Sequence, residues 1–286
     1  KPSEFQQLHI KTVKHEQDVT MECNISEVKN KNTLSWYRQS FGKLPQLIAR
    51  QYGQNNYIFV EGFNNSRFSV TLKDQKFDLT IKNLREDDGG EYFCGEVDEN
   101  SLKFTSGTSL QFEGEEKKLC PTPGTLNKNT HSVTHQGSNS RDGEGKTSDI
   151  KNLHVKTVKF GDDVIMQCNI NGLKNKNSLA WYRQSFEKVP QVFSRPFGQS
   201  STFADGFNDS RFSVTVNDYK FNLNINETRK DDGGEYFCGY VEGSTVKFTS
   251  GTHLQFEGEE MKLCPTPGTL NTHSVTHQGS NSSDRE

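Results

Sequence analysis

The sequence predicts an all-β protein made of two tandem antiparallel β-sandwiches joined by a flexible stalk. Three observations carry this prediction. A block of about one hundred residues occurs twice, apolar and polar residues alternate with period two inside each block, and a polar segment follows each block. The landmark residues of the two blocks are Cys23, Trp36 and Cys94, repeated as Cys168, Trp181 and Cys238.

The alternation indicates strands with one buried and one solvated face. Val19, Met21 and Cys23 fall on one side of a strand, with Thr20 and Glu22 on the other. The second block repeats this pattern, and antiparallel sandwich sheets need it.

The domain boundaries follow from a change in composition. Residues 114–148 are rich in Gly, Ser, Thr, Asn and charge, and almost the same text returns at 258–286. Such segments bury too little apolar surface to offset their ordering entropy. We therefore predict a domain at 1–113, a flexible stalk at 114–148, a second domain at 149–257 and a disordered stalk repeat at 258–286.

The net charge of −3 argues against a nucleic-acid partner or a charge-driven membrane role. Apolar runs such as 47–49 and 58–60 are far shorter than the ~20 residues of a membrane helix. We expect contact with a membrane only through a segment absent from this chain.

Cysteine usage indicates an oxidising compartment, because six cysteines accompany two domains. Five Asn-X-Ser/Thr sequons agree with an extracellular, cell-surface or secreted glycoprotein. Their acceptors are Asn24, Asn64, Asn208, Asn226 and Asn281.

Each block places a Trp 13 residues after its first Cys and a Tyr two residues before its second Cys. This spacing is typical of an immunoglobulin sandwich, in which a disulfide ties the two sheets. The resemblance implies the disulfides Cys23–Cys94 and Cys168–Cys238. Their separations of 71 and 70 residues leave room for the two extra edge strands of a nine-stranded V-set domain.

Several motifs narrow the resemblance. Residues 36–39 resemble the second framework of T-cell receptor alpha and antibody light-chain variable domains, and residues 104–110 resemble a joining segment. Thr105 stands where that segment normally has a Gly supporting a bulge. The stretch 62–81, with variable domains on repetitive stalks, is most similar to novel immune-type receptors of bony fish.

The resemblance implies a face on which variable domains pair. Its members here are Tyr37, Gln39, Pro45, Leu47, Phe93 and Phe104, with the repeats Tyr182, Gln184, Pro190, Val192, Phe237 and Phe248. Phe93 alternates with inward neighbours, so it points off the sheet and needs a cover. We expect a homodimer or pairing within the chain, with Gln39 and Gln184 exchanging two amide hydrogen bonds. The alternative is a monomer whose loops cover this face.

The loops at 27–33, 51–59 and 95–103 would cluster at the end where variable domains bind ligand. Tyr52, Tyr57 and Phe59 are the expected contact residues, because aromatic side chains supply area at low entropic cost. The alternative interpretation is a tolerated surface without a ligand.

Two further features lie outside these sites. Arg67 with Asp88, and Arg211 with Asp232, are expected to form structural ion pairs. Cys120 and Cys264 lie outside both domain disulfides, in Leu-Cys-Pro-Thr-Pro. They are candidates for a bridge between chains, or alternatively for a bridge to each other.

No catalytic, cofactor or metal motif occurs, so we expect no enzyme, cofactor or metal. The predicted function is extracellular recognition of a protein ligand, as the ectodomain of an immune receptor. The alternative is an adhesion protein that acts by homophilic domain pairing.

Overall fold

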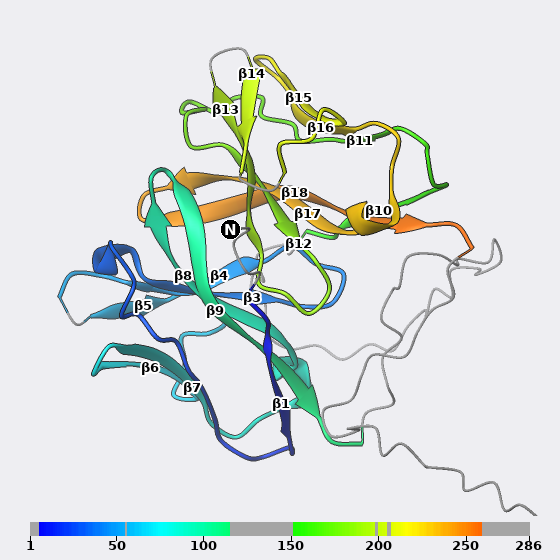
Figure 1. The fold of residues 1–286 in the computed structure, drawn as a ribbon. Coiled ribbons are helices and arrows are strands. Elements are labelled where there is room, and N and C mark those ends of the chain that lie inside the picture. Colours follow the sequence, from blue (N-terminus) through cyan, green and yellow to red (C-terminus); the bar gives the residue numbers. More distant parts are fainter. Residues whose placement is uncertain (1–5, 55, 115–150, 198–199, 205–206, 259–286) are drawn as a thin grey trace, which may run out of the picture.

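The computed structural model describes residues 6–54, 56–114, 151–197, 200–204 and 207–258, which form two β-sandwiches (Figure 1). We call them domain 1 (β1–β9) and domain 2 (β10–β18). The predicted all-β fold with two V-type sandwiches is confirmed. The described residues contain short 3-10 turns but no α-helix, and they form no helix long and apolar enough to cross a bilayer.

Domain 1 packs a six-stranded sheet, in the order β1-β9-β8-β3-β4-β5, on a three-stranded sheet, β2-β7-β6. Its elements are β1 (His9–Val13), β2 (Val19–Met21), η1 (Lys31–Thr33), β3 (Ser35–Gln39), β4 (Gln46–Gln51), β5 (Tyr57–Phe59), β6 (Phe68–Lys73), β7 (Lys76–Ile81), η2 (Glu86–Asp88), β8 (Gly90–Asp98) and β9 (Ser101–Phe112).

Domain 2 repeats both sheets in the same order, as β10-β18-β17-β12-β13-β14 and β11-β16-β15. Its elements are β10 (His154–Val158), β11 (Val164–Met166), β12 (Ala180–Gln184), β13 (Gln191–Phe197), β14 (Ser200–Phe203), β15 (Phe212–Val216), β16 (Phe221–Ile225), η3 (Lys230–Asp232), β17 (Gly234–Glu242) and β18 (Thr245–Phe256).

Each sandwich has its own core, built by the predicted alternation. Met21 and Cys23 are fully buried beside Trp36 in domain 1, and Met166, Cys168 and Trp181 repeat this arrangement in domain 2. Each indole nitrogen is satisfied, because Trp36 Nε1 donates to the Phe77 carbonyl at 3.1 Å and Trp181 Nε1 donates to the Phe221 carbonyl at 2.9 Å. Burial of each Trp therefore leaves no indole N–H donor without an acceptor.

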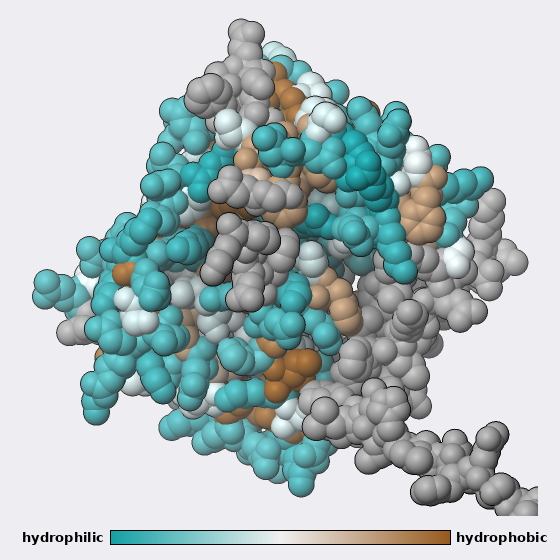
Figure 2. All heavy atoms as spheres, viewed as in Figure 1, coloured by the Kyte–Doolittle hydropathy of each residue, from teal (hydrophilic) through white to brown (hydrophobic). Residues whose placement is uncertain are grey.

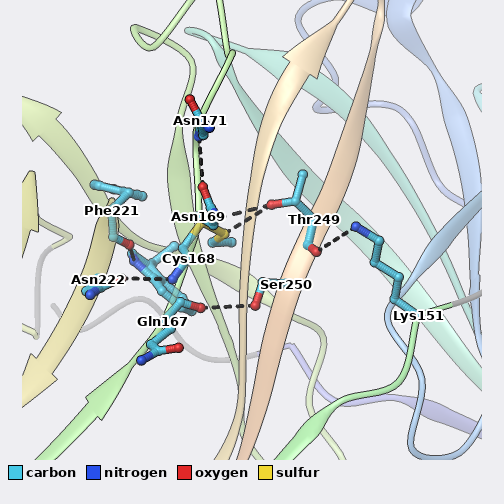
Figure 3. The surroundings of a disulfide bond; sticks show 11 residues. Lys151, Gln167, Cys168, Asn169, Asn171, Phe221, Asn222, Thr249 and Ser250 are labelled. Carbon is cyan, nitrogen blue, oxygen red and sulfur yellow. Dashed lines mark hydrogen bonds between the residues drawn. A yellow bond between two sulfur atoms is a disulfide. The ribbon is translucent and has the colours of Figure 1, made fainter. Parts of the chain in front are cut away.

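A disulfide joins the two sheets in each domain, Cys23 to Cys94 and Cys168 to Cys238. Figure 3 shows the second, where Asn222 Oδ1 accepts the Cys168 amide at 3.0 Å. Asp78 plays the same part for the Cys23 amide.

The corner before the second cysteine strand is fixed by a buried tyrosine and an ion pair. Tyr92 Oη donates to the Asp88 carbonyl at 2.5 Å, and Arg67 binds the Asp88 carboxylate with two nitrogens at 2.7 and 2.9 Å. Arg211 and Asp232 repeat the pair at 2.7 and 3.1 Å. Within the part of the chain that the structure describes, these corner residues bind each other and their own domain, in keeping with a structural role.

The joining-segment strand carries a bulge although a Thr replaces the usual Gly. Cys94 faces Ser106 while Gly95 faces Phe104, so Thr105 is the extra residue. Domain 2 shifts register at the corresponding position. Thr105 does not take a positive φ, so this bulge needs no glycine.

Candidate functional site

A third apolar cluster lies between the domains and is shared by both. Its buried members are Leu8, Tyr37, Leu44, Phe93, Leu102 and Phe104 from domain 1, and Leu153, Ala180, Tyr182, Val189, Phe237, Val246 and Phe248 from domain 2. We call this set the pairing cluster. It brings six predicted pairing-face aromatics together: Tyr37, Phe93, Phe104, Tyr182, Phe237 and Phe248.

The remaining apolar residues of the predicted face lie at its edge. Pro45 and Pro190 are buried, while Leu47 and Val192 are half-buried and pack against the pairing cluster. Phe93 is fully buried. Its side chain therefore points away from its own sheet and lies in the apolar cluster that both domains form.

Two tyrosines connect the domains through hydrogen bonds that are related by a pseudo-two-fold axis. The Leu102 amide of β9 donates to Tyr182 Oη, and the Val246 amide of β18 donates to Tyr37 Oη, both at 2.9 Å. Both hydroxyls are buried, and burial raises the pKa of Tyr37 to about 12. These bonds satisfy two buried backbone amides, one on β9 and one on β18.

The expected exchange of amide bonds between Gln39 and Gln184 is wrong. Gln39 Nε2 donates instead to Glu235 Oε2, and Gln184 Nε2 donates to Glu91 Oε2, each at 2.8 Å. Each glutamine therefore meets a glutamate of the facing domain instead of the other glutamine. The signal was present in the sequence, because a Glu precedes Tyr-Phe-Cys in both blocks.

Short backbone arms cross between the domains, and sequence reasoning missed them. The Leu8 amide donates to the Glu187 carbonyl at 3.0 Å, and the Val189 amide donates to the Gln6 carbonyl at 2.9 Å. The reciprocal arm bonds Leu153 to the Gly42 carbonyl at 2.9 Å and Leu44 to the Lys151 carbonyl at 3.0 Å. The repeated pattern Leu-His-Ile/Val-Lys-Thr-Val at the start of each domain marks these arms.

Close approach of the two domains requires glycine at Gly251. A Cβ there would lie 2.6 Å from Leu44 Cδ2 of domain 1, 2.7 Å from Leu153 and 3.0 Å from Phe237. Gly107 is equally confined, by Leu8 and Phe93 at 2.7 Å. In each domain, the glycine of the joining segment therefore makes room for a leucine of the arm, Leu8 at Gly107 and Leu153 at Gly251.

The three predicted ligand-contact residues differ in accessibility. Tyr52 is 59% exposed and lies under the Arg50 guanidinium, with 5.7 Å between that group and the ring centre. Tyr57 and Phe59 lie in β5 and pack against the core of domain 1, so they present little area to a ligand. Of the three, Tyr52 is the one open to contact.

A buried carboxylate anchors the first loop of domain 1. Glu96 of β8 accepts the Lys29 amide at 3.2 Å and the Asn30 amide at 2.6 Å. Thr33 Oγ1 accepts the Val97 amide at 2.9 Å. The first loop is therefore tied to the strand that leads into the third loop.

The third loop of domain 1, in the β8–β9 hairpin, reaches over domain 2 (Figure 1). Arg195 of β13 donates to the Glu99 carbonyl at 2.8 Å and to Ser101 Oγ at 2.5 Å. A cavity of about 330 Å³ lies beneath, lined by both domains. Its apolar wall includes Leu102 and Pro190, and its polar rim includes Lys103 and Arg195.

Four of the predicted glycosylation acceptors, Asn24, Asn64, Asn208 and Asn226, are exposed. Figure 2 shows hydrophilic side chains over most of the visible surface. Asn281, Cys120 and Cys264 lie outside the described residues.

Comparison with known families gives a match over most of the chain. The Immunoglobulin V-set domain model matches residues 9–113 and 152–257, one stretch in each domain.

Single variable domains match among characterised proteins. "Ig kappa chain V-V region EPC 109" of Mus musculus is 37% identical over 93 residues, which are 32% of this chain and 81% of that protein. "Ig kappa chain V region S211" of Rattus norvegicus is 29% identical over 97 residues, which are 34% of this chain and 84% of that protein.

Solved structures give higher identities. An extracellular fragment of Novel Immune-Type Receptor 10, carrying the mutation N30D, is 66% identical and covers 38% of this chain and 99% of its own, with a TM-score of 0.37. Novel Immune-Type Receptor 11 from Ictalurus punctatus is 64% identical and covers 37% of this chain and all of its own, with a TM-score of 0.37. The family match over both domains confirms the predicted resemblance to immunoglobulin variable domains.

Proposed function

Because this chain belongs to the immunoglobulin V-set family, whose model matches both domains, we propose that it is the extracellular recognition part of an immune receptor. In this proposal the two V domains pair face to face within one chain and present their loops to a protein ligand. The module has no catalytic role. The observation that carries the proposal is the pairing cluster, which is buried and drawn from both domains.

Pairing supports ligand binding because it builds a composite surface. The cavity is lined by the third loop of domain 1 and by β13 of domain 2, so neither domain forms it alone. Loops held on rigid sandwiches carry binding disproportionately. Tyr52 and Lys103 are the residues we assign to ligand contact.

The pairing cluster also favours recognition over homophilic adhesion. A face that is covered inside the chain is not available to a second chain. Beads coated with the chain should therefore stay dispersed, and clumping of the beads would support the adhesion alternative.

The experiment uses a fluorescent multimer of the whole chain as the probe on a panel of cells. Tyr52→Ala and Lys103→Glu should reduce staining of any bound cell type at least about tenfold. Phe41→Ala is the matched control, because Phe41 is 68% exposed and follows the opposite end of β3. Equal loss in the control, or staining that survives both loop changes, would contradict the proposal.

We propose that the stalk cysteines Cys120 and Cys264 join two chains. The protein should then run as a dimer on a non-reducing gel, and Cys120→Ser with Cys264→Ser should give a monomer. A wild-type monomer would remove the bridge between chains.

We also propose that the sequon asparagines carry glycans, in keeping with the exposure of Asn24, Asn64, Asn208 and Asn226. Glycosidase treatment of protein secreted from animal cells should lower its apparent mass. An unchanged mass would refute this assignment.

A further inference from the structure

Two contacts between a carboxyl and a carboxamide lie at the domain interface, in pseudo-two-fold positions. Gln39 of domain 1 meets Glu235, and Gln184 of domain 2 meets Glu91. Each glutamine nitrogen also donates within its own domain, to the Lys43 carbonyl at 3.2 Å or the Lys188 carbonyl at 3.3 Å. Because those carbonyls only accept, the nitrogen of each carboxamide must face them.

The carboxamide oxygens are left without a donor. Gln39 Oε1 and Gln184 Oε1 are both buried, and no group among the described residues donates to either. An unsatisfied buried acceptor destabilises the arrangement that buries it. A proton on the adjacent carboxyl would supply the missing donor.

The surroundings disfavour a charge on either carboxylate. Burial raises the pKa of Glu91 to about 7, with Glu187 adding repulsion. Burial and the nearby Glu91 raise the pKa of Glu235 to about 8. Among the described residues that face them, the one titratable base is His253, whose Nδ1 lies 3.8 Å from Glu235 Oε1.

The lysines beside the glutamines do not compensate these charges. Lys43 and Lys188 contribute backbone carbonyls to the contacts, and the Lys43 ammonium binds Asn152. Burial also lowers the pKa of His253, so this imidazole is neutral in the pair near neutral pH. Protonation of the glutamates is the remaining way to relieve the charge.

We propose that these two contacts form a pH-sensitive latch, in which each glutamate takes up a proton on pairing and closes a cyclic carboxylic acid–carboxamide pair with the facing glutamine. The latch rests on the intrachain pairing proposed above. It makes the closed arrangement of the domains more stable in mildly acidic solution than in alkaline solution.

Proton linkage gives the direction in which pH changes the stability of the paired domains. Each carboxyl has its ordinary pKa of 4.5 when the domains are apart and a raised pKa when they are paired. The stabilisation is therefore complete below the ordinary value and is lost as the pH rises through about 7 and 8. His253 acts in the opposite direction, because its lowered pKa weakens pairing as the pH falls.

The test reads the pairing directly in the full chain. The Leu102 and Val246 amides are bonded to tyrosines of the facing domain, so their hydrogen exchange reports opening of the interface. Exchange rates, each divided by the intrinsic rate at that pH, are compared at about pH 5.5 and about pH 8.5. The Leu79 amide of β7, in the core of domain 1, is the internal reference.

We expect the normalised opening at both amides to rise at least about tenfold from the acidic to the alkaline condition, because one pKa unit of difference corresponds to a tenfold change. In Glu91→Gln with Glu235→Gln, carboxamides replace the protonated acids, and opening should no longer rise with pH. His253→Ser, which copies Ser109 of domain 1, should retain the rise.

Three outcomes would overturn the latch. Protection in the wild type that does not change with pH would refute it while leaving the pairing intact. The same pH dependence in the double Gln variant would assign the effect to other groups. Amides that are open at both pH values would refute the pairing itself and the latch with it.

Discussion

Domains 1 and 2 agree closely at the pairing face and differ at the loop end. Tyr37, Gln39 and Phe104 have identical counterparts in Tyr182, Gln184 and Phe248, and these bury the same way. At the loop end, Tyr240 occupies the position of Glu96, so domain 2 lacks the carboxylate that anchors the first loop of domain 1.

Equivalent arginines show the same divergence. Arg50 lies over Tyr52 of its own domain, whereas Arg195 reaches across to the third loop of domain 1. One set of contacts therefore holds the two domains together nearly symmetrically, whereas the loop surface that they present is asymmetric. Two domains paired in this way present two different sets of loops.

Removing one disulfide should have the largest effect on stability, and it should destabilise one domain more than the other. Cys23→Ala with Cys94→Ala is expected to destabilise domain 1 by about 2–5 kcal/mol, because the unfolded chain loses a long cross-link. Calorimetry should show the domain 1 transition falling by about 10 °C or more while domain 2 changes less. Cys168→Ala with Cys238→Ala is the matched control, and it should reverse the order. Equal shifts of both transitions in each variant would show that the domains unfold as one unit.

Glu96→Ala should free the first loop of domain 1. It leaves two backbone amides, of Lys29 and Asn30, without their acceptor, at an expected cost of about 2–3 kcal/mol. Exchange at those two amides, followed by NMR, should speed up while the Leu102 amide stays protected. Unchanged exchange at Lys29 and Asn30 would contradict the anchoring role.

The two joining-segment phenylalanines should differ although their positions are equivalent. Phe248 meets the Tyr37 ring of the facing domain, with 6.2 Å between centroids, as well as Tyr182 and Phe237 of its own. Among the described residues, the Phe104 ring contacts the rings of Tyr37 and Phe93, both within domain 1. Phe248→Ala should therefore weaken pairing more than Phe104→Ala, by about 1 kcal/mol. Exchange at the Leu102 amide measures the difference, and equal effects would indicate a fully symmetric interface.

Arg195→Ala should have the smallest effect of the series. Its two hydrogen bonds to the third loop are partly exposed, so their loss is worth about 1 kcal/mol or less. We expect faster exchange in the segment 98–101 and no change in the melting of either domain. Arg50→Ala should leave that segment untouched, and a similar change in both variants would remove the asymmetry between the arginines.

Much of the fold was predictable, since its signals are local and repeated. The spacing from Cys23 to Trp36 and Cys94, with period-two alternation, determines strands that face a disulfide-linked core. The residues of the pairing face could be assigned by resemblance as well. Their partners were not assigned, because the sequence places Glu91 and Glu235 on the strand but does not show which acceptor lies opposite each glutamine after docking.

The loop residues show the same limit of sequence reasoning. Tyr57 and Phe59 look like contact residues by composition, yet β5 turns both toward the core. The direction of an edge-strand side chain depends on register with β4, which the sequence does not specify locally. Leu8 and Leu153 were missed because their repeated sequence pattern marks the start of each domain but does not show that the arm crosses to the other domain.

Small-angle scattering of the whole chain tests the central claim, that the two domains pair within one chain, most directly. Phe104→Asp with Phe248→Asp places two charges in the pairing cluster, where both phenylalanines are 7% exposed. We predict that the double variant expands, with a larger radius of gyration than the wild type, while calorimetry shows both sandwiches still folded. An identical radius of gyration in the two proteins would mean that the domains move as separate bodies, which would contradict the account.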